Sequence, residues 1–524
     1  MDSSPVSGWD GGMRVALIFN PFAYKLHEEN LRIVQRYFGL FPPLSLAWVA
    51  AIAERAGHEV IIVDARTLRL TPDEVLTRLK PWKPDVLGFM MTTYMYRETL
   101  DWIRYLRGGL PNAKVVVGGY NLRVYPQESV LAPEIDFGCF NSAYHTFPRL
   151  LEELEGGRHF DDVPGLIFKR DGGVIETEPG PEPDFDDYPN PARHLLPNEL
   201  YAEFPTERKN FSVMVTSKGC PMGCVFCEAG RTAYNPRSVG TVVDEMEQCA
   251  DRFGIREIDI FDYEFLIRRK RALEICREMQ RRKLDILWAC RARIDSVDEE
   301  LIKEMAASGC SRVYFGIESG DQEMLDRVNK GITLEQVRET IKLTRRHGIR
   351  ALGFFLVGSP GETRQSVRQT LKFAKSLDLD YVQFSKTTAK PLTTLWRDLV
   401  AETGHDYWRE YILGNAEEQA LPRPWTELTN DEIDELAYRA YVKFHARPWF
   451  LLRHTLKVRS WSEFKRKLFA FLEMMFRQER RSKADHSFKC YGEDKGKLNW
   501  YKKISKWSQP FWDRPILRAR SVIQ

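Results

Sequence analysis

The segment Ser217-Lys-Gly-Cys-Pro-Met-Gly-Cys-Val-Phe-Cys-Glu228 places three cysteines within eight residues: Cys220, Cys224 and Cys227. It follows the apolar run Phe211-Ser-Val-Met-Val-Thr216, which is typical of a buried strand. A structural zinc ion takes four ligands, and an iron–sulfur cube normally takes four thiolates. The next cysteine is Cys249, in a stretch with a helical pattern, and no histidine lies nearby. Three thiolates on one loop therefore predict a cube with one iron left open for chemistry.

Two other uses of these cysteines remain open on the residues alone. Cys224 and Cys227 form a C-x-x-C redox pair, but that interpretation leaves Cys220 without a role. A zinc ion would need a fourth ligand from a distant part of the chain. Each alternative requires an additional assumption, so the open cube is the main hypothesis.

The spacing C-x3-C-x2-C, with the aromatic Phe226 before the last cysteine, resembles the radical S-adenosylmethionine (radical SAM) enzymes. The resemblance implies that Cys220, Cys224 and Cys227 bind a [4Fe-4S] cluster and that SAM chelates the open iron. It also implies that one electron from the cluster cleaves SAM to methionine and a 5′-deoxyadenosyl radical. Phe226 would then pack near the adenine, although an ordinary core aromatic is equally consistent with its sequence context.

Length and composition predict a multidomain protein of a reducing compartment. The chain has 524 residues with 43% hydrophobic content, which suggests two or three domains. The start Met1-Asp-Ser-Ser-Pro5 lacks the features of a signal peptide, and no segment reaches 18 uninterrupted apolar residues. Of nine cysteines only three cluster, so a cytoplasmic location without a disulfide framework is expected.

Residues 1–155 are predicted to form an α/β domain with a doubly wound parallel sheet, similar to a cobalamin-binding Rossmann domain. Short apolar runs alternate with helical stretches, which is the pattern of such sheets. A helix is expected from Pro42 to Arg55. The expected strands are Arg14–Phe19, Glu59–Val63, Asp85–Phe89 and Lys114–Val117.

Residues 156–210 are expected to form an extended connector, because proline and acidic residues are dense there. Residues 211–390 repeat a strand-then-helix unit about six times. This repeat predicts a partial (β/α)6 barrel with its active residues on the strand–helix loops. The expected strands are Phe211–Thr216, Glu257–Phe261, Ile286–Ala289, Arg312–Gly316, Gly353–Val357 and Tyr381–Phe384.

Residues 391–524 are expected to be helical, with candidates at Trp396–Ala401, Asp431–His445 and Trp461–Phe476. Residues 451–524 carry 19 Lys and Arg against 7 Asp and Glu, whereas the whole chain has a net charge of only +3. The last candidate helix has an apolar side and a basic side. It is expected either to dock on its own protein or to make peripheral contact with a membrane.

Charged residues follow several barrel strands in the order that the radical SAM family uses for SAM or substrate contacts. The resemblance implies such contacts for Asp262, Glu264, Arg293 and Glu318. The chemistry is suitable, because a carboxylate can bind a ribose diol or an ammonium group and an arginine can hold a carboxylate. Lone charges at strand ends are often simply solvated, so the matching order is what supports these roles.

Over residues 13–475 the chain resembles the cobalamin-binding-domain radical SAM class. It is closest to the subgroup of the anaerobic magnesium-protoporphyrin monomethyl ester cyclase and the hopanoid and bacteriochlorophyll methylases. Pro42–Leu46 and Ala56–Val60 match the first helix and second strand of that class. The predicted cobalamin site lies at strand ends and comprises Asn20, Thr92, Thr93 and the glycine pair Gly118 and Gly119.

Two departures from the class concern the cobalamin site. The chain has no Asp-x-His-x-x-Gly run, so no histidine is offered as a lower cobalt ligand. The usual Gly-Glu-Gly-Glu stretch after the last strand of the domain is replaced by Asn141-Ser-Ala-Tyr-His145. Either the site is remodelled or cobalamin has been lost.

The resemblance implies a radical SAM methyltransferase that uses cobalamin to methylate an unactivated carbon of a lipophilic substrate, such as a tetrapyrrole, a hopanoid or another lipid. Flavodoxin or ferredoxin is the expected reductant. A cobalamin-free cyclase or carbon–carbon coupling enzyme remains open, as does a non-enzymatic corrinoid- or redox-sensing protein. An RNA-modifying methylthiotransferase fits poorly, because the chain has no second cysteine cluster and no basic–aromatic interleaving. No nucleic acid is therefore expected as a partner.

Overall fold

The computed structural model builds two separate sheets from the predicted strands. It describes residues 12–21, 39–203, 205–208, 210–416, 422–448 and 450–452, all within a unit that ends at Phe471. The predicted basic helix Trp461–Phe476 lies outside the described residues, as does most of the basic tail.

The first sheet has seven strands in the order β2-β1-β3-β4-β5-β6-β7. The first five are parallel, and β6 and β7 are antiparallel additions at one edge. All four strands that the sequence predicts are present, which confirms the α/β class of this domain. The bounds are β1 (Arg14–Phe19), β2 (Glu59–Asp64), β3 (Val86–Met90), β4 (Lys114–Gly118), β5 (Phe137–Cys139), β6 (Leu166–Arg170) and β7 (Gly173–Glu176).

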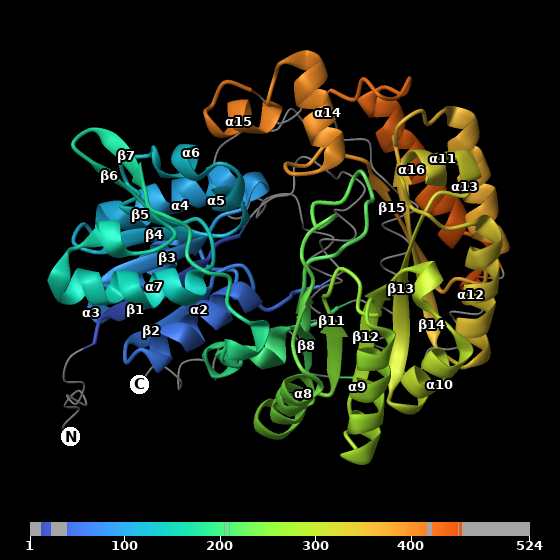
Figure 1. Ribbon diagram of the computed structural model, residues 1–524, viewed down its shortest axis with the longest axis horizontal. Coiled ribbons are helices and arrows are strands. Elements are labelled where there is room, and N and C mark those ends of the chain that lie inside the picture. The colour runs from blue at the N-terminus through green and yellow to red at the C-terminus, as the bar shows by residue number, and fades with distance from the viewer. Residues whose placement is uncertain are drawn as a thin grey trace, which may run out of the picture. The chain divides into compact units, whose positions relative to one another are not determined.

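Helices cover both faces of this sheet (Figure 1). One face packs against α2 (Leu44–Arg55) and α7 (Ala143–Glu152). Because side chains alternate along a strand, Ala16 and Ile18 of β1 face the opposite core. The helices of that second face are α3 (Pro72–Trp82), α4 (Tyr96–Gly109), α5 (Tyr120–Val124) and α6 (Pro126–Val130).

The expectation of an extended connector over residues 156–210 is wrong for its first part. Strands β6 and β7 form a hairpin, and β6 pairs with the edge strand β5. Asp171 and Gly172 at the turn have φ angles of 51° and 78°, the positive values that a two-residue hairpin turn needs. The later, acidic and proline-rich part carries short 3₁₀ turns at Phe185–Asp187, Arg193–Leu195 and Asn198–Leu200.

The second sheet contains six parallel strands, as the sequence predicts, in the order β15-β14-β13-β12-β11-β8. The strands are β8 (Phe211–Met214), β11 (Glu257–Ile260), β12 (Leu287–Ala292), β13 (Cys310–Glu318), β14 (Arg350–Val357) and β15 (Tyr381–Lys386). Figure 1 shows their helices arranged along one side of the strands. These are α8 (Val239–Phe253), α9 (Arg269–Arg281), α10 (Glu299–Ala307), α11 (Gln322–Arg327), α12 (Leu334–Arg346) and α13 (Arg364–Ser376).

The two faces of the barrel strands differ in chemistry. The helix-facing residues of β11, β12 and β13 belong to a large apolar core, whereas the inner face carries buried charges. Arg312 on β13 pairs with Glu257, and its Nη2 donates to Glu203 Oε2 at 3.0 Å. Tyr314 also donates to Glu203, at 2.9 Å. Burial raises the pKa of Glu203 to about 7.

The helices after the barrel attach to different parts of the protein. Two predicted helices are confirmed, as α14 (Thr394–Thr403) and α16 (Asn430–His445), and α15 (Tyr407–Ile412) is additional. Trp408 of α15 joins the core of the first sheet, whereas Ile433 of α16 joins the core of the barrel. Among the described residues, no helix is both long and apolar enough to cross a bilayer.

We expect Arg312→Met to lower the free energy of unfolding by about 3–5 kcal/mol, because two buried carboxylates would lose their cation. Arg327→Met is the matched control, since Arg327 pairs with Glu323 on the surface and both side chains are largely exposed. That change should cost less than about 1 kcal/mol. Urea denaturation followed by circular dichroism measures both, and equal losses would contradict this interpretation of the network.

Candidate active site

A single buried carboxylate anchors the start of the cysteine loop. Asp262, two residues after β11, accepts four hydrogen bonds from two residues that follow β8. They come from Thr216 N and Oγ1, at 2.6 and 2.5 Å, and from Ser217 N and Oγ, at 3.1 and 2.7 Å. Asp262 was predicted to contact SAM or substrate, but its oxygens are occupied. We therefore assign it a positioning role.

The cysteine loop then folds back on itself through main-chain hydrogen bonds. Arg231 N donates to Met222 O at 2.8 Å, and Thr232 N donates to Cys220 O at 3.0 Å. Gly219 has a φ of +78°, and a Cβ atom there would lie 1.9 Å from Ala233 O. The glycine before Cys220 is thus required by both conformation and space.

The three thiols lie on this loop, with Cys220 and Cys224 buried and Cys227 half-buried. Burial, and to a smaller extent the neighbouring thiols, raise the pKa of Cys227 to about 11. The Cys227 thiol is therefore protonated at neutral pH unless a metal holds it as a thiolate. Among the described residues, no three side chains of His, Cys, Asp or Glu are grouped so that they could hold a single metal ion. In a cube, each thiolate binds its own iron, and soft sulfur donors suit that ligation.

Two predicted SAM-site residues are held tightly near the cysteines. Glu264 accepts hydrogen bonds from Leu266 N, at 2.9 Å, and from Arg293 N. Burial raises the pKa of Glu264 to about 7. The Arg293 guanidinium is fixed by Asp295 through two bonds of 2.8 Å and reaches Cys224 Sγ with Nη1 at 3.7 Å. The geometry thus brings Arg293 to the cysteine loop, while its predicted contact with SAM or substrate stays a prediction.

Glu318 forms a buried ion pair that sequence reasoning missed. Lys330 Nζ lies 2.8 Å from Glu318 Oε1, and both side chains are less than a tenth exposed. Glu318 has a φ of +68°, which is strained for a residue with a side chain. Burial lowers the pKa of Lys330, but Glu318 and Cys224 outweigh it and raise the value. No local pattern distinguishes Lys330, because it lies on the loop after α11.

Lys330 and Arg293 together place two cations beside the cysteine loop. Arg293 Nη2 donates to Lys330 O at 2.6 Å, so the two residues are joined through the main chain. Positive charge favours thiolates over thiols and stabilises a negatively charged ligand. This arrangement suits both a thiolate-bound cluster and the carboxylate of SAM. Phe226 is half-buried on the same loop, and its predicted packing near the adenine stays a prediction.

The predicted cobalamin residues all lie at the carboxyl edge of the first sheet. Its strand order reverses between β1 and β3, where open α/β sheets bind their ligands. Asn20 follows β1, and Thr92 and Thr93 follow β3. Two buried atoms at this edge, Thr93 Oγ1 and Asn121 Oδ1, have no hydrogen-bond partner within the described chain. Both atoms are enclosed by the protein, so this edge of the sheet carries polar groups that the described chain leaves unsatisfied.

The two glycines after β4 serve different purposes. A Cβ atom on Gly118 would meet no other atom within 4 Å, so the space beside it is open. Gly119 has a φ of +109°, and a Cβ atom there would lie 2.9 Å from Met91 O. Gly119 is needed for the turn itself. Gly118 instead leaves room for a flat ligand, and these residues fit a corrin ring.

The unusual stretch Asn141–His145 binds the connector. Asn141 Nδ2 donates to Gly180 O at 2.9 Å, and Ser142 Oγ lies 2.7 Å from Tyr188 Oη. Tyr144 donates to Asp187 O at 3.0 Å. The departure from the usual acidic and glycine-rich stretch therefore accompanies a new contact with the connector.

The edges that carry the two predicted sites meet at residues 387–395. Tyr120, directly after the glycine pair, donates to Pro391 O at 2.9 Å. On the other side, Leu395 N donates to Val225 O of the cysteine loop at 3.1 Å. Burial raises the pKa of Tyr120, and the charges of Glu228 and Cys227 raise it further. Tyr120 therefore lies close to the cysteine loop.

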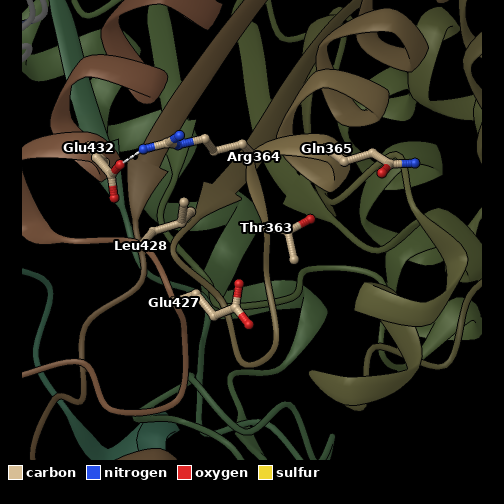
Figure 2. A pocket seen from close by; sticks show the side chains of 6 residues that line it. All are labelled: Thr363, Arg364, Gln365, Glu427, Leu428 and Glu432. Carbon is tan, nitrogen blue, oxygen red and sulfur yellow. Dashed lines mark hydrogen bonds and ion pairs between the residues drawn. The ribbon is translucent and has the colours of Figure 1, made fainter.

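Figure 2 shows a surface pocket elsewhere on the barrel, with a volume of about 490 Å³. It lies where α13 and α16 begin, and Arg364 pairs with Glu432 across it. None of the predicted cofactor residues lines it, so we do not assign it to the reaction. Its lining residues are Thr363, Arg364, Gln365, Glu427, Leu428 and Glu432.

Comparisons with known proteins agree with this geometry. The Radical SAM superfamily matches residues 214–374, and the B12 binding domain matches residues 32–151. An uncharacterised methyltransferase of Pyrococcus horikoshii is 33% identical over 79% of this chain and 89% of its own length. The chain belongs to the B12-binding radical SAM family. The family resemblance and the cofactor set of [4Fe-4S] cluster, SAM and cobalamin are thereby confirmed.

Other relatives of this radical SAM enzyme have related activities. The anaerobic magnesium-protoporphyrin IX monomethyl ester cyclase of Rubrivivax gelatinosus is 30% identical over 69% of this chain and 67% of its own length. The methyltransferase TsrM of Kitasatospora setae, solved with cobalamin and a [4Fe-4S] cluster, has a TM-score of 0.60 at 22% identity. That similarity covers 75% of each chain and supports the fold. The individual cofactor contacts stay predictions.

We expect Cys220→Ala, Cys224→Ala and Cys227→Ala each to abolish cluster binding. Anaerobic reconstitution should leave less than half of the about four irons that a cube holds in the unaltered protein. Production of 5′-deoxyadenosine from SAM should fall at least about 100-fold, because the electron source is lost. Cys249→Ala and Cys276→Ala are controls, since both thiols are buried in helices away from the loop. Full iron content in the three loop variants would contradict the ligand assignment.

Gly118→Val tests the cobalamin edge, because a Cβ atom at Gly118 would meet no other atom within 4 Å. We expect retention of hydroxocobalamin after gel filtration to fall at least about tenfold, which corresponds to 1.4 kcal/mol of binding free energy. Gly108→Ala, on α4 and equally unobstructed, is the control. Unchanged corrin absorbance in the valine variant would place cobalamin elsewhere.

Proposed function

We propose that this enzyme transfers a methyl group to an unactivated carbon of a substrate with a large apolar part. The observation that carries the proposal is the contact through residues 387–395, which joins the loop of Tyr120 to the cysteine loop. A substrate between these loops would have access to both cofactors at once. Radical formation and methyl delivery require such access.

The cofactors and the protein have different tasks in the proposed reaction. The cluster and SAM supply a carbon-centred radical that removes a hydrogen atom, and cobalamin supplies the methyl group. Arg293 and Lys330 present positive charge to the carboxylate of SAM. Asp262 holds the base of the cysteine loop, so the radical would form at a fixed place.

The inner face of the barrel supports an apolar body in the substrate. Tyr314 and Phe354 stack there with ring centroids 5.7 Å apart. We propose a tetrapyrrole, a hopanoid or another lipid, because Phe354 is only partly buried and offers an aromatic surface. The Rubrivivax relative acts on a tetrapyrrole by its name. Radical SAM enzymes need a reductant, and we propose flavodoxin or ferredoxin. Membrane contact through the basic tail, and a cytoplasmic location, stay predictions.

A second candidate is a ring-forming or carbon-coupling reaction that uses the radical without methyl transfer. The relationship to a cyclase favours it, because the Rubrivivax cyclase is 30% identical over 69% of this chain. The two candidates differ in one product. Methyl transfer consumes a second SAM and releases S-adenosylhomocysteine, whereas cyclisation does not.

We expect the enzyme, reconstituted anaerobically with iron, sulfide and hydroxocobalamin and then supplied with SAM and dithionite, to form 5′-deoxyadenosine and S-adenosylhomocysteine together. Liquid chromatography with mass spectrometry measures both products. Omitting hydroxocobalamin should suppress the second product at least about tenfold while the first continues, since only methyl transfer needs the corrin. The first product alone, with cobalamin bound, would favour the second candidate.

A further inference from the structure

Arg291 is an unusual charge on the inner face of the barrel. It lies on β12 between Cys290 and Ala292, which face the apolar core under the helices. Because side chains alternate along a strand, Arg291 points to the opposite face, toward the barrel interior. Its side chain is 24% exposed, although its partner Asp259 is fully buried. Part of the Arg291 side chain is therefore accessible to solvent, whereas its partner is not.

The buried Asp259 carboxylate fixes the orientation of the Arg291 guanidinium. Arg291 Nη1 and Nη2 donate to the two carboxylate oxygens of Asp259 at 2.6 and 3.2 Å, and Nη1 also donates to Ile260 O at 2.9 Å. The fork of two hydrogen bonds to one carboxylate sets the plane of the group. A guanidinium held in this way does not need to become ordered when a ligand arrives.

One edge of the guanidinium is left open. An arginine has five N–H donors, and the bonds to Asp259 and Ile260 use the end formed by Nη1 and Nη2. Within the described chain no acceptor is bonded to Nε. The side formed by Nε and the outer N–H of Nη2 therefore presents two parallel donors, the pattern that carboxylates and phosphonates accept.

Two aromatic rings lie against the guanidinium. The guanidinium carbon lies 3.9 Å from the ring centroid of Phe261 and 5.0 Å from that of Tyr314. Phe354 stacks on Tyr314 in the next strand, and Phe354 and Phe261 are only partly buried. The interior thus combines an apolar, aromatic wall with one oriented donor pair.

We propose that Arg291 is a specificity-determining residue that binds an oxyanion, a carboxylate or a phosphonate, at one end of an otherwise apolar substrate. The inference rests on the proposed function for the place of the substrate in the barrel. It also changes the substrate class, from a wholly lipophilic molecule to an amphiphile with an acidic group. Such a group held at Arg291 would direct the opposite, apolar end toward the cysteine loop.

Phenylphosphonate is a suitable probe, because it joins an aromatic ring to an oxyanion. Isothermal titration calorimetry is performed anaerobically on the reconstituted holoenzyme with saturating SAM, so that the cations near the cluster are already occupied. We expect phenylphosphonate to bind at least tenfold more tightly than benzyl alcohol, which lacks the charge. No detectable binding of phenylphosphonate, or equal binding of the two compounds, would overturn the proposal.

Three variants locate the site. Arg291→Met should weaken phenylphosphonate binding at least tenfold, because the donor edge is removed. Asp259→Asn should tighten it, because the competing negative charge is removed while the amide oxygen can still accept one of the bonds that orient the guanidinium. This variant carries the test if Arg291→Met does not fold. Arg282→Met is the matched control, since Arg282 is 19% exposed and likewise paired with carboxylates, but on the helices outside the barrel. If all three variants bound phenylphosphonate with the affinity of the unaltered enzyme, the assignment would be refuted.

The binding measurement requires no turnover, so the two proposals can fail separately. Absence of S-adenosylhomocysteine in the reconstituted enzyme would refute methyl transfer and leave Arg291 as the anion site of a radical enzyme. Loss of the difference between phenylphosphonate and benzyl alcohol would refute the anion site and leave methyl transfer untouched.

Discussion

The hydrogen bonds to Asp262 are the constraint on which the predicted cluster site depends. A buried carboxylate with four donors holds the two residues that follow β8, and the cysteine loop begins at the next residues. Burying this charge is tolerable only because every donor is in place. The buried Asp262 carboxylate, which would be destabilising without these donors, thus fixes the start of the loop that carries the three thiols.

Alternation along parallel strands separates the apolar core from the charged groups in the barrel. One face of the barrel strands builds the apolar core with the helices, and the other carries charged groups such as Arg291 and Arg312. In the first sheet both faces are apolar, so its polar groups are confined to the strand ends. The candidate functional residues therefore lie at the carboxyl edges of both sheets. In the barrel they also lie on the inner face of the strands.

Local patterns predicted most of the architecture, because short apolar runs separated by helices leave few alternatives to parallel sheets. All six barrel strands and the first four strands of the other sheet follow from such runs. The hairpin β6–β7 was missed, although the Asp171-Gly172 turn is a recognisable signal. The acidic, proline-rich residues that follow the hairpin favoured an extended connector and obscured this short pair of strands.

The sequence by itself determined the cysteine loop, the family and the order of the elements, because all three follow from residue types and their spacing along the chain. Only the tertiary structure decided that Lys330 meets Glu318, that Tyr120 approaches the cysteine loop and that Arg291 faces the barrel interior. These contacts join residues that are distant along the chain or depend on which face of a strand is enclosed. Packing of whole elements sets such pairs, and no local pattern records them.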